Sequence, residues 1–209
     1  MERENAHKSL QILSELYKDA RSALHYQTAY ELLIAVILSA QCTDERVNKV
    51  TAELFKEHNT PQAMLRLSQE ELEHYIFSCG LYKSKAAHIL SASRDIIDRF
   101  GGQVPDRFAD LKSLAGVGQK TANVVSSVWF ERDAIAVDTH VFRVSNRLGL
   151  ANANTPFKTE EQLKQNIPQK DWSKAHHWLI YHGRRVCHSQ KPDCEHCALR
   201  EYCDYYLKK

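Results

Sequence analysis

A turn that contains two glycines leads into a lysine in the segment LAGVGQK, residues 114–120. Glycine suits a turn in which φ is positive or in which another molecule approaches the backbone closely. The residues after the turn favour a helix, and the first N–H groups of a helix attract anions because they lack partners within it. Gly116, Val117 and Gly118 are therefore a candidate phosphate receptor, although a plain corner between two helices would have the same sequence.

Lys120 is expected in the first turn of the helix that follows. The positive end of the helix dipole favours a neutral amine there, and a neutral amine is a nucleophile. Asp138 is the second candidate, but an aspartate at this position also has a purely structural use as the N-cap of the helix that it begins. Most single lysines are solvated surface residues, so the catalytic interpretation depends on the two residues in combination.

Four of the six cysteines lie close together near the C-terminus, with the spacing C-x6-C-x2-C-x5-C. They are Cys187, Cys194, Cys197 and Cys203. The N-terminal residues carry no secretory signal, so disulfides are less expected than a metal site. Four thiolates suit either a zinc ion or an iron–sulfur cluster. Structural zinc sites often pair two short knuckles and this spacing has only one, which favours a [4Fe–4S] cluster and leaves zinc open.

The densest basic stretch of the chain surrounds the first of these cysteines. Arg184 and Arg185 precede it, and Lys191 lies in the loop HSQKPD that follows it. Such a loop, held by a metal, could contact phosphate, and it could equally be a solvated charged surface. Cys42 and Cys79 stand apart from the cluster, and their favoured interpretation is as small buried hydrophobic residues.

Helices must position all of these residues. Tyr30, Leu33, Ile34, Ile37 and Leu38 recur at helical spacing, and Val47, Val50 and Leu54 continue with a second apolar stripe. Ser68 with Glu71 predicts a capping box, and Gly101 with Gly102 predicts a helix end. No segment alternates apolar and polar residues convincingly. The sequence therefore predicts an all-α protein with short connections and a domain boundary near residue 133.

Composition and charge narrow the class of protein only broadly. The chain has 209 residues and a formal net charge of +2, which neither indicates nor excludes a nucleic-acid partner. Its longest apolar run, residues 32–38, is far too short to cross a bilayer. We therefore expect a soluble protein that is cytoplasmic or nucleoid-associated, without a membrane partner.

The motifs together resemble a known family. LAGVGQKTANVV, AVDTHVFRVSNRLG, LLIAVILSAQCTD and the four-cysteine tail are similar to the endonuclease III family, the bifunctional DNA glycosylases of the helix-hairpin-helix superfamily. The resemblance extends from about Tyr30 to Cys203. It implies two all-α domains with a DNA-binding cleft between them. Residues 22–132 would form a helical barrel that holds the hairpin, and residues 1–21 with 133–209 would form the domain of the [4Fe–4S] cluster.

The resemblance also implies an activity in base excision repair. Members of this family remove oxidised pyrimidines from duplex DNA and cut the strand on the 3′ side of the abasic sugar by β-elimination. Lys120 matches the nucleophile, which forms a Schiff base, and Asp138 matches the catalytic aspartate. Gln41 and Leu81 match the residues that fill the gap left by the extruded nucleotide and separate the bases. The four clustered cysteines match the cluster ligands, and the expected partner of a monomeric chain is DNA with damaged bases or abasic sites.

Two residues depart from the family pattern, and three alternatives remain. Ala115 stands where the hairpin usually has proline, and Cys79 stands where a larger aliphatic residue is usual. The first alternative is the adenine-mismatch glycosylase of the same superfamily, but that enzyme has no lysine nucleophile, uses a glutamate where this chain has Ala35, and continues into a further C-terminal domain. The others are a non-catalytic DNA-binding protein and a zinc-stapled helical protein unrelated to DNA.

Overall fold

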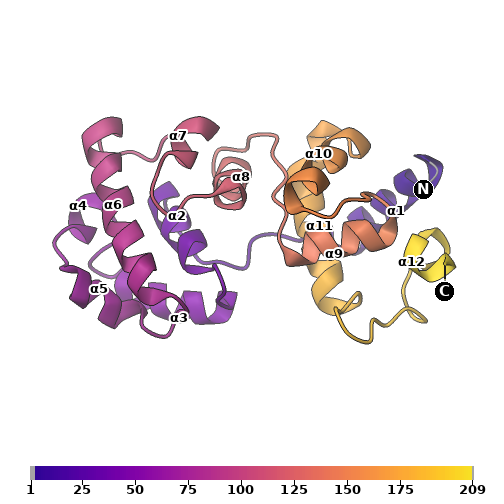
Figure 1. Ribbon diagram of the computed structural model, residues 1–209, viewed down its shortest axis with the longest axis horizontal. Coiled ribbons are helices and arrows are strands. Elements are labelled where there is room, and N and C mark those ends of the chain that lie inside the picture. Colours follow the sequence, from indigo (N-terminus) through magenta and orange to yellow (C-terminus); the bar gives the residue numbers. More distant parts are fainter. Residues whose placement is uncertain (1–2, 209) are drawn as a thin grey trace. The chain divides into compact units, whose positions relative to one another are not determined.

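Helices are the only regular elements in residues 3–208, the part of the chain that the computed structural model describes (Figure 1). This confirms the predicted all-α class. The chain divides into two compact units, residues 22–130 and residues 1–21 with 131–209. The domain boundary expected from the sequence lies two residues later, between residues 132 and 133. Within the described residues, no helix is long and apolar enough to cross a membrane.

The unit of residues 22–130 is built around its first helix, α2 (Ala29–Leu38). This helix packs against α3 (Asp44–Leu54), α6 (Tyr82–Phe100) and α8 (Gln119–Val128). Residues 30–38 of α2 are all buried, so the predicted apolar stripe is in fact a helix enclosed on every side. The remaining helices of this unit are α4 (Pro61–Met64), α5 (Gln69–Ile76) and α7 (Phe108–Lys112).

Local signals in the sequence set the ends of these helices. The Ser68 hydroxyl accepts a hydrogen bond from the backbone N–H of Glu71, and the Glu71 side chain accepts one from the N–H of Ser68, which confirms the predicted capping box. The helix α6 ends where Gly101 adopts φ of 62°, as the Gly101–Gly102 pair predicts. Caps of this kind each contribute about 1 kcal/mol to helix stability.

The second unit combines the N-terminal helix with the C-terminal third of the chain. Its helices are α1 (Arg3–Leu16), α9 (Thr139–Leu148), α10 (Pro156–Asn166), α11 (Trp172–Arg185) and α12 (Asp204–Leu207), with single 3₁₀ turns at Gln169–Asp171 and Arg200–Tyr202. The long helix α11 packs against both α9 and α1.

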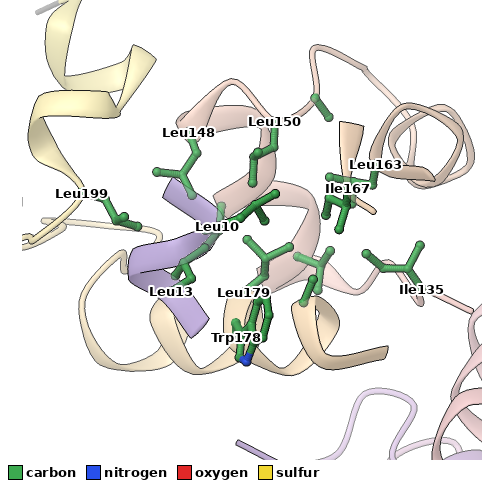
Figure 2. Packing of buried hydrophobic residues seen from close by; sticks show 14 of the residues in the cluster. Leu10, Leu13, Ile135, Leu148, Leu150, Leu163, Ile167, Trp178, Leu179 and Leu199 are labelled. Atoms are coloured by element: carbon green, nitrogen blue, oxygen red, sulfur yellow. The ribbon is translucent and has the colours of Figure 1, made fainter. Parts of the chain in front are cut away.

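The core of this unit joins residues from distant parts of the sequence. Leu10 and Leu13 of α1 lie beside Leu148 of α9 and Leu179 of α11, as Figure 2 shows. Full burial of such a leucine contributes about 1.5–3 kcal/mol. The N-terminal helix is therefore an integral part of the unit that carries the clustered cysteines.

Candidate functional site

The predicted hairpin is present, and α7 and α8 are its two helices. Leu114 and Val117 anchor the turn because both side chains are buried, and the N–H of Val117 donates to the carbonyl of Leu114 at 3.1 Å. Gly116 has φ of 74°, and a Cβ there would lie 2.9 Å from the Cβ of His88 on α6. Both conformation and packing therefore require glycine at this position.

Gly118 differs from Gly116, because neither its backbone conformation nor its packing requires glycine. It is the N-cap of α8, its φ is −85°, and a Cβ added to it would meet no atom within 4 Å. Neither strain nor packing excludes a side chain here, so the open space lies directly in front of the N-terminus of α8. Lys120, the second residue of α8, is exposed. The hairpin thus places an amine and the positive end of a helix dipole together on the surface.

Gln41 and Leu81 lie on two neighbouring turns of the same unit. Both adopt the left-handed conformation, with φ of 55° and 60°, which is uncommon for residues other than glycine. The turns touch, since a Cβ on Gly80 would lie 3.3 Å from the carbonyl oxygen of Gln41. Leu81 is 59% exposed, although it is apolar. The structure therefore presents an apolar side chain and an amide side by side on strained, exposed backbone.

A buried lysine, which the sequence analysis did not identify, supports the Gln41 turn. Lys85 on α6 is only 4% exposed, and its Nζ donates to the carbonyl oxygens of Leu38 at 2.8 Å and Ala40 at 2.7 Å. These carbonyls lie at the C-terminal end of α2, where the helix dipole favours a cation. Burial lowers the pKa of Lys85 below its usual range. No signal in the sequence separates this lysine from its exposed neighbour Lys83.

Replacing Lys85 tests this supporting contact. Lys85→Met leaves two carbonyl oxygens near the end of α2 without their charged donor. We expect the free energy of unfolding to fall by about 3 kcal/mol, because hydrogen bonds to charged groups are worth about 1.5–3 kcal/mol each. Urea unfolding measures the change, and Lys83→Met is the matched control on an exposed position of the same helix. Equal stability of the two variants would show that the buried ammonium does not hold the turn.

Asp138 lies in the other unit, at the start of α9. Its Oδ1 accepts a hydrogen bond from the N–H of Val141 at 2.8 Å, which confirms its predicted use as an N-cap. The side chain is half-buried. Burial lowers the pKa of the nearby His140, and the carboxylate of Asp138 opposes that effect. Asp138 thus has a structural use whether or not it also has a chemical one.

Arg143 connects α9 to the end of α11 and to the first clustered cysteine. Its Nη2 donates to the carbonyl of Gly183 at 3.0 Å, and its Nε donates to the carbonyl of Cys187 at 3.1 Å. The same Nη2 lies 3.1 Å from Nδ1 of His140. The helix that begins at Asp138 is therefore fixed to the cysteine segment by one side chain, a link that residue spacing alone does not reveal.

All four clustered cysteines line one pocket. Cys187, Cys194, Cys197 and Cys203 share its lining with His182 of α11 and Leu148 of α9, among others. Over residues 3–208, however, no three His, Cys, Asp or Glu side chains converge closely enough to hold a single metal ion. Four thiolates suit either a single zinc ion or an iron–sulfur cluster.

Arg147 of α9 contacts two of these cysteines. Nη1 of Arg147 lies 3.4 Å from Sγ of Cys187 and also donates to the carbonyl of His188 at 2.6 Å, while Nη2 donates to the carbonyl of Ser189. Sγ of Cys203 lies 3.3 Å from the carbonyl oxygen of Arg147. Arg147 therefore fixes the loop after Cys187.

The basic stretch lies on the surface of this unit, as the sequence predicts. Arg184, Arg185 and Lys191 are all exposed. The guanidinium of Arg185 stacks on Tyr181, with Cζ 4.8 Å from the ring centroid, so its orientation is restricted. Lys191 has φ of 48° in the loop that Arg147 holds. Arg184 and Lys191, two of the predicted DNA contacts, belong to the same unit as Asp138. Gln41, Leu81, the hairpin and Lys120 belong to the other unit.

Residues 34–169 match the family described as the HhH-GPD superfamily base excision DNA repair protein. This range contains the hairpin, Lys120 and Asp138. The chain is 46% identical to endonuclease III of Rickettsia conorii over 99% of both chains, and 44% identical to endonuclease III of Escherichia coli K12 over 98% of both chains.

Solved structures give the same result. A trapped covalent intermediate of endonuclease III and DNA is 43% identical, with a TM-score of 0.96 over 100% of this chain and 98% of the other. A non-covalent endonuclease III–DNA complex is 42% identical, with a TM-score of 0.95 over the same shares. A thermostable thymine-DNA glycosylase shares the fold at 24% identity, with a TM-score of 0.89 over 99% of this chain and 98% of the other. The chain belongs to the endonuclease III family, within the HhH-GPD superfamily of base excision DNA repair proteins.

Proposed function

We propose that this protein is a base excision repair DNA N-glycosylase with AP lyase activity, which removes oxidised pyrimidines from duplex DNA and cuts the strand at the resulting abasic site. The observation that carries the proposal is the exposed amine of Lys120 in the first turn of α8, directly after a hairpin whose backbone is open at Gly118. Family membership supplies the substrate class. Because its partner is DNA, we further place the protein in the cytoplasm, at the nucleoid.

Lys120 is the proposed nucleophile. Its neutral Nζ attacks C1′ of the damaged nucleotide, and the base leaves with the electron pair of the glycosidic bond. Loss of a proton from nitrogen and opening of the sugar ring give a Schiff base between Nζ and C1′. The Schiff base acidifies the C2′ proton, and its removal expels the 3′ phosphate by β-elimination. Hydrolysis of the imine then releases the cut strand and regenerates the amine.

Asp138 is the proposed acid–base and electrostatic partner. Its carboxylate would accept the proton from the Lys120 amine, or stabilise the positive charge that develops at the sugar as the base leaves. The N-cap hydrogen bond to Val141 uses Oδ1 and fixes the orientation of the carboxylate. The same contact therefore serves both folding and chemistry, because it limits the rotation of the group that must meet the sugar.

The Asp138→Asn variant separates the two uses of this side chain. Asparagine is as good an N-cap as aspartate, so we expect the free energy of unfolding to change by less than about 0.5 kcal/mol. Release of thymine glycol from duplex DNA should fall about 10²–10⁴-fold, because the amide can neither accept the proton nor carry the charge. Single-turnover excision and urea unfolding measure the two quantities. An unchanged excision rate would leave Asp138 with its structural use alone.

Gln41 and Leu81 are proposed to enter the DNA. The damaged nucleotide must leave the stack before Lys120 can reach C1′, and unstacking costs a few kcal/mol. Leu81 is compact, apolar and exposed, which suits a side chain that separates neighbouring bases. The amide of Gln41 would fill the space that the extruded nucleotide leaves. Gly116, Val117 and Gly118 with the start of α8 would bind a phosphate, and Arg184 and Lys191 would bind others.

The hairpin glycines give a test of the phosphate contact. Gly118→Ala should change stability by less than about 0.5 kcal/mol, because a Cβ there meets no protein atom. It should nevertheless weaken binding of duplex DNA, because the methyl group occupies the space in front of the helix N-terminus. Gly116→Ala is the contrasting variant. Its positive φ and its contact with His88 predict a loss of about 2 kcal/mol or more in stability.

Fluorescence anisotropy with an abasic-site analogue duplex and urea unfolding separate the two glycine effects. If Gly118→Ala binds the duplex as tightly as the unsubstituted protein, the phosphate does not approach α8 at this point.

The four clustered cysteines are proposed to hold a [4Fe–4S] cluster. Their shared pocket and the spacing C-x6-C-x2-C-x5-C, which has only one short knuckle, support this choice over zinc. The cluster would supply four metal–thiolate links that fix the segment from Cys187 to Cys203. In the chain itself, Arg147 holds the loop of Lys191 against α9, so that the basic residues are presented on an ordered surface.

A further inference from the structure

Two cysteines outside the cluster lie together at the Gln41 and Leu81 turns. Cys42 directly follows Gln41, and Cys79 lies two residues before Leu81. The Cys42 thiol acts electrostatically on Cys79, and neither cysteine is in a disulfide. The turns that carry them also touch through Gly80 and the Gln41 carbonyl. Residues 37 positions apart in the sequence are therefore held within reach of each other by the fold.

The two thiols differ in exposure. Cys42 is half-buried, whereas Cys79 is fully buried. Burial, and then the neighbouring Cys42 thiol, raise the pKa of Cys79 to about 12. The charge of Lys85 opposes this rise, and the same ammonium is held in place by the carbonyls of Leu38 and Ala40. An accessible thiol beside a second thiol that can resolve its oxidised form is the arrangement of a redox-sensing pair.

We propose that Cys42 and Cys79 form a reversible disulfide that joins the Gln41 turn to the Leu81 turn and slows base excision. The second half of this statement rests on the proposed function, since it assigns both turns to DNA. The cross-link itself does not, because it depends only on the position of the two sulfurs. The pair is separate from the four cysteines of the proposed cluster, which lie in the other unit.

The chemistry needs a two-electron oxidant, which we take to be a hydroperoxide or a small-molecule disulfide. With a hydroperoxide, the Cys42 thiolate attacks the peroxide oxygen, an alcohol or water leaves, and Cys42 becomes a sulfenic acid. The sulfur of Cys79 loses its proton and attacks the sulfur of Cys42, which expels hydroxide to form water. With a small-molecule disulfide, Cys42 forms a mixed disulfide first, and Cys79 then displaces the small thiol.

The disulfide would change the geometry of both turns. It fixes the sulfur–sulfur separation at about 2.05 Å, so the turns or the side chains must adjust to the cross-link. Gln41 and Leu81 are neighbours of the moving residues and already adopt left-handed backbone, which leaves little conformational freedom to absorb the shift. Misplacement of positioning groups by about 1 Å can cost about 10²-fold in rate. We expect the oxidised protein to excise about 10–100-fold more slowly than the reduced protein.

The experiment treats the cluster-loaded protein with oxidised glutathione or with dithiothreitol. Peptide mapping by mass spectrometry without reduction detects the cross-link, and visible absorbance follows the cluster through the treatment. Excision of thymine glycol is then measured for each form. Cys42→Ser and Cys79→Val are the matched variants, since each removes one sulfur of the pair, and valine keeps the buried site filled.

The proposal predicts one cross-linked peptide that joins Cys42 to Cys79, slower excision with unchanged cluster absorbance, and recovery in dithiothreitol. Excision by both variants should be insensitive to the oxidant. Glutathione attached to Cys42 without any cross-link would overturn the pairing, and a cross-link that leaves the excision rate unchanged would overturn its effect on DNA. Failure of the reduced protein to excise any lesion would instead contradict the proposed function, and the peptide map would still decide whether the disulfide forms.

Discussion

Lys120→Ala is expected to abolish strand cleavage at abasic sites and to lower excision of thymine glycol by at least about 10⁴-fold. Loss of a covalent nucleophile removes the reaction path itself, and in other enzymes such a loss costs about 10⁶-fold in rate. Affinity for an abasic-site analogue should fall much less, because one exposed lysine contributes one charge among several. Single-turnover cleavage of a labelled duplex and fluorescence anisotropy measure the two effects.

The matched control for this variant is Lys112→Ala, which removes an equally exposed lysine from α7, the other helix of the hairpin. We expect it to cleave at nearly the original rate. If Lys120→Ala lost rate and affinity in the same proportion, Lys120 would be a phosphate contact, and the nucleophile would have to be sought elsewhere.

Cys197→Ala is expected to remove the proposed [4Fe–4S] cluster and to unfold the segment from Cys187 to Cys203. Iron content should fall from about four atoms per chain to below about one, with loss of the visible absorbance. The unit of residues 1–21 and 131–209 should lose stability, because Cys197 packs against its core and Cys203 belongs to that core. DNA affinity should fall with it, since Arg184 and Lys191 lie on or beside this segment.

Iron analysis, thermal unfolding and limited proteolysis of the same preparation check this prediction. Cys42→Ser is the control, because Cys42 lies in the other unit and should leave the iron content unchanged. A Cys197→Ala protein that kept its fold, its proteolytic resistance and its DNA affinity would show that the cysteine site does not stabilise the binding surface.

Local features of the fold follow from the sequence to a large extent. The capping box at Ser68, the helix end at Gly101 and the N-cap at Asp138 each depend on residues within six positions of one another, and all three are confirmed. The glycine turn before Lys120 is of the same kind. Helical periodicity also predicts the all-α class, although it does not reveal that α2 is enclosed on all sides.

Features that depend on distant residues do not follow from the sequence in the same way. Lys85 looks like any other lysine until the fold brings it against the carbonyls of Leu38 and Ala40, more than forty positions away. The left-handed backbone of Gln41 and Leu81 has no marker, because neither residue type favours it. The sequence predicts that Cys42 and Cys79 are both buried, whereas Cys42 is only half-buried, and their proximity appears only in the folded chain.

The central claim, that Lys120 attacks the sugar, is tested most directly by reduction of the covalent intermediate. The unsubstituted protein is incubated with a duplex that contains one abasic site in the presence of borohydride, and the adduct is digested and mapped by mass spectrometry. Borohydride reduces a Schiff base to a stable secondary amine. We therefore expect a single DNA-modified peptide with the modification on Lys120. An adduct on any other amine, or tight binding with no adduct at all, would contradict it.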